Sequence, residues 1–364
     1  MTTERYDTVV VGGGQAGLTA GYELQRRGRD FVILDAHERI GEAWRRRWDS
    51  LVLFTPARFN GLPGMRFPAS GGHFTTKDHM GDFLESYAAR FDLPVRTGER
   101  VTSVERRGDG FSITTERGGY EAANVIVAMA NFQQPRIPAF AAELDPSIRQ
   151  LHSHEYRNLE QLQEGPALVV GLGNSGADIG LEVARDRETW IAGRPVAVVP
   201  FRIDPWFARN VLVRLVRFLG TRVLTLRTPL GRKARAKLTA APLVRVKPKD
   251  LEAAGAHRVG RITGARDGRP VTEEGEVLDV RNVIWCTGYR PGFSWIDLPV
   301  FGDHQEPIHD RGVVGSEPGL YFVGLHFLYA AASDTVTGMP RDVRHVMKHL
   351  DRHRPHVGES AAAA

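Results

Sequence analysis

Cysteine is almost absent from this chain of 364 residues, in which Cys286 stands alone. A single cysteine cannot close a disulfide within the chain, nor can it supply the pair of thiols that a redox-active dithiol requires. Lysine is scarce as well, because only six of the 48 basic residues are lysines. This preference for arginine, together with abundant alanine and glycine, indicates a GC-rich genome more than a nucleic-acid surface, and no nucleic-acid-binding motif is present.

Long apolar runs are also missing. No stretch approaches 18 uninterrupted apolar residues, so the sequence predicts no membrane-spanning helix. The first residues lack the basic and apolar regions of a signal peptide, and we therefore expect a cytoplasmic protein. With 42% hydrophobic and 25% charged residues, the composition is that of a globular protein, and the length favours about two domains. No spacing of histidine, cysteine or acidic residues indicates a metal site.

The chain opens with a strand, a glycine-rich turn, a helix and a second strand. An apolar run over 6–11 predicts a buried parallel strand, 18–27 has helical composition, and 31–34 predicts the next strand. The turn between them reads Gly12-Gly13-Gly14-Gln15-Ala16-Gly17. In such a GxGxxG turn, a pyrophosphate binds at the N-terminus of the helix.

Each glycine of this turn has an expected task. Gly12 permits the tight turn, Gly14 lets the backbone approach the pyrophosphate, and Gly17 lets the helix pack closely on the strand. Asp35 follows Gly17 by 18 residues, near the spacing of an acid that binds ribose hydroxyls. The first unit therefore predicts a dinucleotide site.

The same unit returns about 160 residues later. A strand over 167–170 and a helix over 177–185 flank a second turn, and a strand over 189–192 follows. The turn residues expected to bind a cofactor are Gly171, Gly173, Asn174, Ser175 and Gly176. Here the second strand ends without an acid, at Gly193-Arg194, and an arginine can pair with a 2′-phosphate that an acid would repel. We therefore predict NADP at this turn, with a solvated Arg194 as the alternative.

Two such units predict an α/β fold with two Rossmann-like dinucleotide-binding domains, the second inserted into the first. We expect the first domain to span 1–150, the inserted NADP domain 151–280, and the return segment of the first domain 281–350. In this return segment we expect a strand over 282–285, another near 319–324, and a closing helix over 340–350. A tail over 351–364 is expected to be disordered.

At this point the sequence resembles the flavin-containing monooxygenases, including plant YUCCA-like enzymes and a bacterial branch of short flavoproteins. The resemblance runs nearly end to end. The first turn resembles the family's FAD turn, and Gly171 to Ile179 resembles its NADPH turn, GxGNSGxDI. Gly41-Glu42-Ala43-Trp44 with Arg45 resembles the GxxW segment beside the flavin, and Thr287-Gly288-Tyr289 resembles a late turn of the family. The resemblance implies FAD at the first turn, with contacts from Gln15, Ala16, Trp44 and Arg45, and NADPH at the second.

The linker before the second turn carries a further likeness. His152 and Tyr156 stand at the spacing of the family's identifying linker sequence, and the tyrosine favours heteroatom or YUCCA-type oxygenation over the Baeyer–Villiger type. In the segment that holds Phe54 and Thr55, the family often has an asparagine near the flavin, where this chain has Phe54. The resemblance places Phe54, Thr55 and Asn174 in the environment where flavin and oxygen meet.

The reaction that the resemblance implies passes hydride from NADPH to FAD. A C4a-hydroperoxide of the flavin then gives one oxygen atom of O₂ to a nitrogen, sulfur or carbon centre of a small substrate. Two alternatives stay open: an NADPH-dependent flavin oxidase or reductase that releases peroxide, which the Phe54 segment favours, and a non-enzymatic redox-sensing flavoprotein.

The sequence also leaves two questions of association open, and the first is whether the chain forms a homodimer. The segment 201–250 holds 13 lysines and arginines but two aspartates, so contact with a membrane surface is a further possibility beside a substrate-covering or solvated segment.

Overall fold

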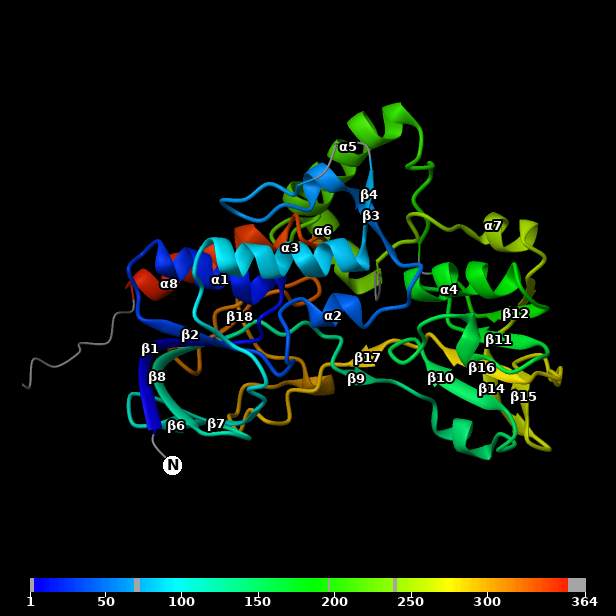
Figure 1. The fold of residues 1–364 in the computed structure, drawn as a ribbon, viewed down its shortest axis with the longest axis horizontal. Coiled ribbons are helices and arrows are strands. Elements are labelled where there is room, and N and C mark those ends of the chain that lie inside the picture. The colour runs from blue at the N-terminus through cyan, green and yellow to red at the C-terminus, as the bar shows by residue number, and fades with distance from the viewer. Residues whose placement is uncertain (1–2, 69–72, 196, 238–240, 353–364) are drawn as a thin grey trace, which may run out of the picture.

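Two separate β-sheets, each built around parallel strands, organise the chain (Figure 1). The structure is a computed structural model that describes residues 3–68, 73–195, 197–237 and 241–352. Each sheet carries one of the glycine-rich turns, and the expected α/β fold with two Rossmann-like domains is confirmed. The tail expected to be disordered lies, from residue 353 onward, outside the described residues.

The first sheet joins a parallel layer to an antiparallel meander. Its strands are, in spatial order, β5 (Val95–Arg96), β2 (Phe31–Leu34), β1 (Thr3–Val11), β8 (Gly119–Val127), β7 (Gly110–Thr115) and β6 (Val101–Arg107). The end of β8 also pairs in parallel with β18 (Leu320–Phe322), so the expected strand near 319–324 is confirmed. Both faces of the parallel layer are covered, which is why its strands read as continuous apolar runs.

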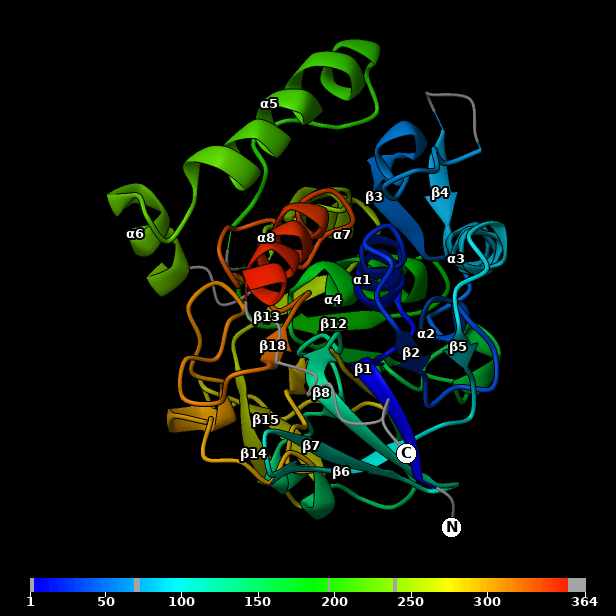
Figure 2. The ribbon, with the colours of Figure 1, turned by 90° about the vertical axis from the view of Figure 1, so that its left-hand side faces the viewer.

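Helices cover one face of this sheet. They are α1 (Gln15–Gln25), α3 (Lys77–Arg90) and α8 (Met339–Arg352), which lie side by side in both views (Figures 1 and 2). The expected closing helix is therefore confirmed as α8, and it packs along α1. Between β2 and α3 the chain forms the short helix α2 (Glu42–Arg45), the strand β3 (Val52–Pro56), the 3₁₀ turn η1 (Ala57–Phe59) and the strand β4 (Phe74–Thr76).

The second sheet is parallel throughout. Its strands are, in spatial order, β10 (Arg149–His152), β16 (Asn282–Trp285), β11 (Ala167–Val170), β12 (Thr189–Ala192) and β13 (His257–Val259). The helices α4 (Asn174–Ala184) and α7 (Pro248–Ala253) pack together beside it. The other flank carries the turn η2 (Ala139–Glu143) and the hairpin of β14 (Ile262–Arg266) and β15 (Arg269–Thr272). The turn η3 (Leu159–Gln161) packs on the same side as α4.

One expected strand lies in the other sheet. We expected 282–285 to open the return segment of the first domain, but β16 pairs with β10 on one side and β11 on the other. Its four residues are all buried, because β16 fills the centre of the second sheet. The chain thus completes the second sheet before it returns, which moves the start of the return segment beyond Trp285.

A two-stranded ribbon connects the sheets. It pairs β9 (Gln134–Pro135), on the way into the second sheet, with β17 (Tyr289–Arg290), on the way back. The short turn η6 (Asp303–Gln305) follows on the return path. Because the two crossings are hydrogen-bonded to each other, the ribbon is one shared connection between the domains.

The basic segment forms a helix that stands away from the body of the molecule (Figure 2). It consists of the π-helical turn η4 (Ala208–Leu212), the helix α5 (Val213–Phe218) and the π-helical turn η5 (Leu219–Val223), and α6 (Pro229–Lys237) follows. We refer to residues 208–223 as the projecting helix. Among the described helices, none is long and apolar enough to cross a bilayer.

Candidate active site: two glycine turns and the linker between them

The first glycine turn contains two glycines that the fold itself requires. Gly12 has a φ of +108°, in the region that side chains disfavour. A Cβ at Gly17 would lie 1.8 Å from the carbonyl oxygen of Gly12, so only glycine lets α1 approach the end of β1. These two positions explain the shape of the turn without any ligand.

Gly14 differs from both. Its backbone is extended, with φ −76° and ψ −171°, a conformation open to any residue. A Cβ built there meets no atom within 4 Å, so neither strain nor packing requires a glycine. The open space lies at the N-terminus of α1, where no side chain caps the helix. Free backbone N–H groups and the helix dipole attract an anion there, so the residues present fit a pyrophosphate.

Asp35 closes the other side of this turn. Its carboxylate accepts hydrogen bonds from the backbone N–H of Gly13 at 2.6 Å and of His37 at 2.8 Å. Burial alone would raise the pKa of Asp35, but the hydrogen bonds from His37 and Gly13 outweigh it and lower the pKa. An ionised acceptor at the end of β2 suits a ribose hydroxyl, so the role expected of Asp35 stays a prediction.

The second turn repeats the first. Gly171 has a φ of +107°, and a Cβ at Gly176 would lie 1.8 Å from the carbonyl oxygen of Gly171. A Cβ at Gly173 again meets no atom within 4 Å, and Gly173 precedes the uncapped N-terminus of α4. The chain therefore presents two open, uncapped helix ends of the same construction, one on each sheet.

Asn174 and Ser175 begin α4 beside this open space. The Asn174 amide donates to the carbonyl of Pro242 at 3.0 Å, and its oxygen accepts from the N–H of Val244 at 3.3 Å. Asn174 thus fixes the end of the basic segment against the second turn. Ser175 is partly exposed at the same helix end.

A contact that sequence reasoning missed joins the two domains next to this turn. Arg245 donates to the carbonyl of Val52 in β3 at 2.9 Å. Its charge also acts on Asp178 in α4, although burial dominates there and raises the pKa of Asp178 to about 6. No spacing in the sequence relates these three residues, since they meet only through the fold. The contact ties the segment that holds Phe54 to the second turn.

Arg194 lies where the sequence placed it, after β12. Gly193 packs against the second turn, because a Cβ added there would lie 3.7 Å from the Cα of Gly171. The Arg194 side chain is 86% exposed and lies 3.6 Å from a carboxylate oxygen of Glu273. Arg258 also reaches this corner and donates to the carbonyl of Gly193 at 3.2 Å. Two arginines, rather than one, therefore lie at the corner where we expected a 2′-phosphate, and the sequence pointed only to Arg194.

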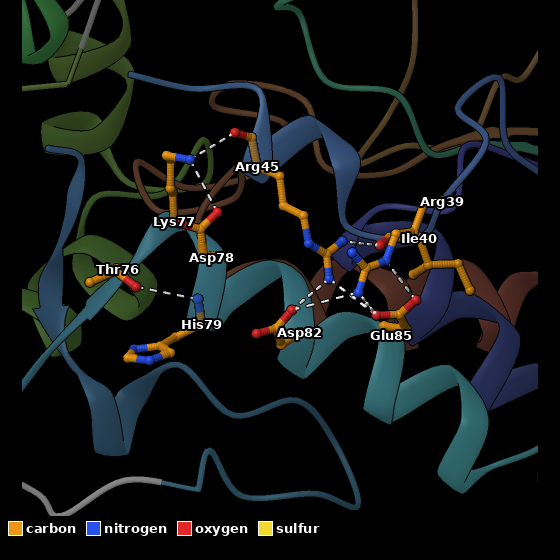
Figure 3. A network of polar contacts seen from close by, with 9 residues as sticks. All are labelled: Arg39, Ile40, Arg45, Thr76, Lys77, Asp78, His79, Asp82 and Glu85. Carbon is orange, nitrogen blue, oxygen red and sulfur yellow. Dashed lines mark hydrogen bonds and ion pairs between the residues drawn. The ribbon is translucent and has the colours of Figure 1, made fainter. Parts of the chain in front are cut away.

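Arg45 is engaged with α3 rather than with the first turn (Figure 3). Its guanidinium donates to Asp82 at 2.8 Å, to Glu85 at 3.2 Å and to the carbonyl of Ile40 at 2.6 Å. Gly41 packs directly on α3 as well, because a Cβ there would lie 2.5 Å from the carbonyl oxygen of Gly81. This geometry makes Arg45 an anchor of α2, which holds Trp44 partly buried against the core.

Phe54 and Thr55 occupy β3 and are partly buried. The Thr55 hydroxyl donates to Asn60, which is fully buried and donates in turn to Thr75 at 2.9 Å. Thr55 is therefore committed to a structural network, and Phe54 offers no polar group. Asn60 is an asparagine of this region that the sequence reading did not single out.

The linker histidine and the late turn, far apart in sequence, meet at the ribbon. His152 is fully buried, and its Nδ1 accepts from the N–H of His154 at 3.1 Å. Its Nε2 lies 3.0 Å from the carbonyl of Gly288, to which it must donate. Burial lowers the pKa of His152, so the ring is neutral and holds the ribbon in place. The ring also packs edge-on against Tyr289, 5.0 Å between centroids.

Two other residues of these motifs, Tyr156 and Thr287, also make contacts within the fold. Tyr156 is fully buried, and burial, with the charge of Glu182, raises the pKa of its hydroxyl. Thr287 donates to the carbonyl of Arg136, next to the first strand of the ribbon. The linker motif and the late turn together fix how the two domains are joined.

A histidine–aspartate pair beside the first turn was also missed. His326 Nδ1 lies 2.9 Å from a carboxylate oxygen of Asp334, and Gln15 donates to the Asp334 carbonyl at 3.4 Å. Gly324 brings this loop close to α1, since a Cβ there would lie 3.0 Å from the Cβ of Ala16. The strand β18 precedes this loop and pairs in parallel with β8, which brings the loop to Gln15 and Ala16.

Cys286 packs beneath the second turn. A Cβ at Gly171 would lie 2.4 Å from the Cys286 carbonyl oxygen. Burial raises the pKa of the Cys286 thiol to about 12, which leaves it protonated and poorly nucleophilic. Over the described ranges, no group of three or more His, Cys, Asp or Glu side chains is arranged to hold a metal ion.

Two matched glycine turns, each at the edge of its own sheet and joined by a ribbon, define a fold with two dinucleotide-binding domains. Residues 9–198 match the family described as pyridine nucleotide-disulphide oxidoreductase. An uncharacterized CzcO-like oxidoreductase of Geobacillus kaustophilus is 37% identical over 356 residues, covering 95% of this chain and 99% of the relative. The probable indole-3-pyruvate monooxygenase YUCCA7 of Arabidopsis thaliana is 28% identical over 87% of this chain and 82% of its own length.

A solved structure extends the likeness to three dimensions. The flavin-containing monooxygenase from Stenotrophomonas maltophilia matches with a TM-score of 0.78 and 27% identity, covering 96% of this chain and 99% of that one. The chain belongs to the pyridine nucleotide-disulphide oxidoreductase family and, within it, to the flavin monooxygenase-like flavoproteins. These similarities confirm the expected enzyme class, a monooxygenase-type oxidoreductase, and its expected cofactors, FAD and NADPH.

Proposed function

We propose that this protein is an NADPH-dependent flavin monooxygenase that oxygenates a small organic substrate at a nitrogen, sulfur or carbon centre. The observation that carries the proposal is the pair of open glycine positions, Gly14 and Gly173. At neither position does the backbone or the packing require a glycine, and both positions lie at uncapped helix ends. A bound phosphate at each end accounts for both.

In this proposal the first turn binds FAD. The N–H groups at the start of α1 hold the pyrophosphate, and Asp35 accepts from the ribose. Gln15 and Ala16 lie at the same helix end, under the loop that carries Asp334. Trp44, packed against the core from α2, is the aromatic residue expected beside the flavin, while Arg45 acts through α3.

The second turn binds NADPH. Gly171, Gly173 and Gly176 give the pyrophosphate access to the start of α4, and Arg194 and Arg258 receive the 2′-phosphate. Glu273 must give up its pair with Arg194 when that phosphate arrives. The Arg245–Val52 contact keeps the second turn beside the segment that holds Phe54.

Bound FAD would supply electron transfer to O₂ and the reactive oxygen for the substrate. The chain's own residues position the two cofactors and exclude water. Phe54 contributes an apolar surface, and Thr55 is held by Asn60. His152, neutral and hydrogen-bonded to Gly288, fixes the ribbon that sets the distance between the two turns.

A second candidate function is an NADPH oxidase that releases peroxide. The composition of β3 favours it, because Phe54 has no hydrogen-bond donor and the Thr55 hydroxyl is already used. Without a donor, an oxygen adduct would decay to peroxide sooner.

The cytoplasmic location and a homodimer stay expectations from the sequence.

Substrate-dependent coupling separates the two functions. Purified protein, loaded with FAD, is supplied with NADPH and O₂ and a panel of amines, thioethers and carbonyl compounds. The panel includes a 2-oxo acid, since the plant relatives are named as indole-3-pyruvate monooxygenases. A monooxygenase shows faster NADPH oxidation and less peroxide per NADPH with at least one compound. An oxidase releases one peroxide per NADPH with all of them.

A further inference from the structure

Two neighbouring cavities lie between the projecting helix, the 58–66 loop and the start of α8. Their volumes are about 330 and 620 Å³, and Arg217, Thr337 and Arg344 line both. Seven arginines line the two cavities together, whereas no aspartate or glutamate does. We refer to the two cavities as the arginine cleft.

Most of these arginines have no carboxylate partner within the described residues. Arg58, Arg214, Arg217 and Arg344 form no ion pair with any described carboxylate, while Arg341 lies 3.5 Å from the buried Asp342. Many arginines outside the cleft do pair with carboxylates, as Arg96 with Glu4 and Arg106 with Glu317 show. An arginine-rich chain exposes solvated arginines in many places, but this does not explain why no aspartate or glutamate lines the two cavities.

The cleft is built rather than accidental. Two guanidinium groups pack over the ring of Phe59, Arg58 at 4.7 Å and Arg217 at 4.3 Å from its centre. Arg58 donates to Asn210 at 2.7 Å and to the Arg209 carbonyl at 2.6 Å, which fixes it to the projecting helix. The Nε atoms of Arg58 and Arg217 are nevertheless buried without a hydrogen-bond partner.

The positive charges in the cleft act on one another. Burial lowers the pKa of Arg217, and the charges of Arg214 and Arg58 lower it further. The same holds for Arg58, on which Arg214 and Arg209 act. Keeping such groups together costs free energy, and a bound anion would relieve it.

We propose that the arginine cleft is a binding site for an organic anion, with a phosphate or carboxylate group held by Arg214, Arg217 and Arg344. Planar guanidinium forks match the oxygens of both groups. Leu62, Met65 and Val336 line the wider cavity and offer an apolar surface to the rest of the ligand. The anion can come from a soluble acid or from the headgroup of an acidic lipid.

The lipid source has its own feature in the structure. Along the projecting helix and the residue before it, Phe207, Val211, Leu215 and Phe218 recur on one face, and each is at least 44% exposed. An apolar stripe beside basic residues is the pattern of helices that lie in a membrane interface. The experiment therefore has separate arms for soluble anions and for lipid surfaces.

The test is a calorimetric titration of the FAD-loaded protein with phenyl phosphate and with benzoate at low salt. Saturating NADP⁺ is present throughout, so that the second turn is not available to the probes. We expect binding that Arg214→Gln and Arg344→Gln each weaken about tenfold, the loss of one charge-assisted pair. Both residues are exposed, so these variants leave the fold intact. Lys233→Gln, in the same basic segment but outside the cleft, is the matched control.

A second arm measures co-sedimentation with vesicles of phosphatidylglycerol and of phosphatidylcholine. Binding to the acidic vesicles alone, weakened by the cleft variants but not by Lys233→Gln, assigns the anion to a lipid headgroup. Binding of the soluble probes with the same variant pattern assigns it to a soluble acid. An equal effect of Lys233→Gln, or no binding in either arm, overturns the site. None of these readouts depends on oxygen transfer.

Discussion

Substitution of Gly14 separates FAD binding from folding, because neither backbone strain nor packing requires a glycine there. Because its φ and ψ suit any residue and its Cβ would meet open space, Gly14→Ala should fold normally. The smaller freedom of the unfolded chain should even stabilise the flavin-free protein, by about 0.4–1 kcal/mol. The Cβ would, however, stand where the pyrophosphate must approach.

The expected loss of FAD affinity follows from the contacts at the start of α1. Displacing the pyrophosphate costs about two charge-assisted hydrogen bonds, each worth about 1.5–3 kcal/mol. The sum of about 3–6 kcal/mol corresponds to a roughly 10²- to 10⁴-fold weaker affinity. Gly14→Val, with a longer side chain, should purify without colour.

Two other glycines serve as controls for this experiment. Gly17→Ala places a Cβ 1.8 Å from a carbonyl oxygen, so it should destabilise the flavin-free protein by about 1–3 kcal/mol or more. Gly173→Ala should keep FAD and lose NADPH affinity. The assays are the ratio of flavin to protein absorbance, calorimetric titration with FAD, and melting of the flavin-free proteins. Full FAD occupancy in Gly14→Val, or melting as low as that of Gly17→Ala, would refute the reasoning.

Three further predictions concern specificity, pH and oxygen chemistry. Arg194→Ala should lower the ratio of NADPH to NADH turnover about tenfold, through one lost charge-assisted pair, and an unchanged ratio would move this role to Arg258. Since burial raises the pKa of Asp178 from 3.8 to about 6, the folded state loses stability as pH rises through this interval. In denaturant unfolding, Asp178→Asn should therefore raise the free energy of unfolding by about 1–3 kcal/mol at pH 7 and by little at pH 4. The exposed Asp109→Asn is the control and should leave the free energy of unfolding unchanged at both pH values. Equal gains for Asp178→Asn at both pH values would show that titration of Asp178 is not the cause. Phe54→Asn should add a hydrogen-bond donor and lower the peroxide released per NADPH in a peroxidase-coupled assay, and an unaltered yield would place Phe54 away from the reacting oxygen.

The strands beside the glycine turns could be predicted from the sequence because their signal is local. The strands at 31–34, 167–170 and 189–192 have the predicted bounds, since a buried parallel strand is a continuous apolar run between polar or glycine stops. The place of β16 could not be predicted in this way. A short apolar run does not say which strands will lie beside it, and β16 pairs with two strands that come much earlier in the chain.

The site residues also differ in whether their partners are near in sequence. The glycines of the first turn and Asp35 belong to one short unit, so their spacing was enough to predict a dinucleotide site. The partners of Arg45 lie on α3 and those of His152 at the ribbon, and only the folded chain brings them together. The outward stripe of Phe207, Val211, Leu215 and Phe218 has a helical period, but the same period is typical of a stripe that faces a core.

Rapid mixing of the NADPH-reduced, FAD-loaded protein with O₂ tests the central claim most directly. If the protein is a monooxygenase, oxidised flavin absorbance should return in two phases, with a distinct spectrum between them, because an oxygen adduct must persist long enough to meet a substrate. NADP⁺ retained at the second turn should lengthen the interval, and Gly173→Ala should shorten it. A single phase that releases one peroxide per flavin, unchanged by NADP⁺ and by every substrate of the panel, would contradict the account and identify an oxidase.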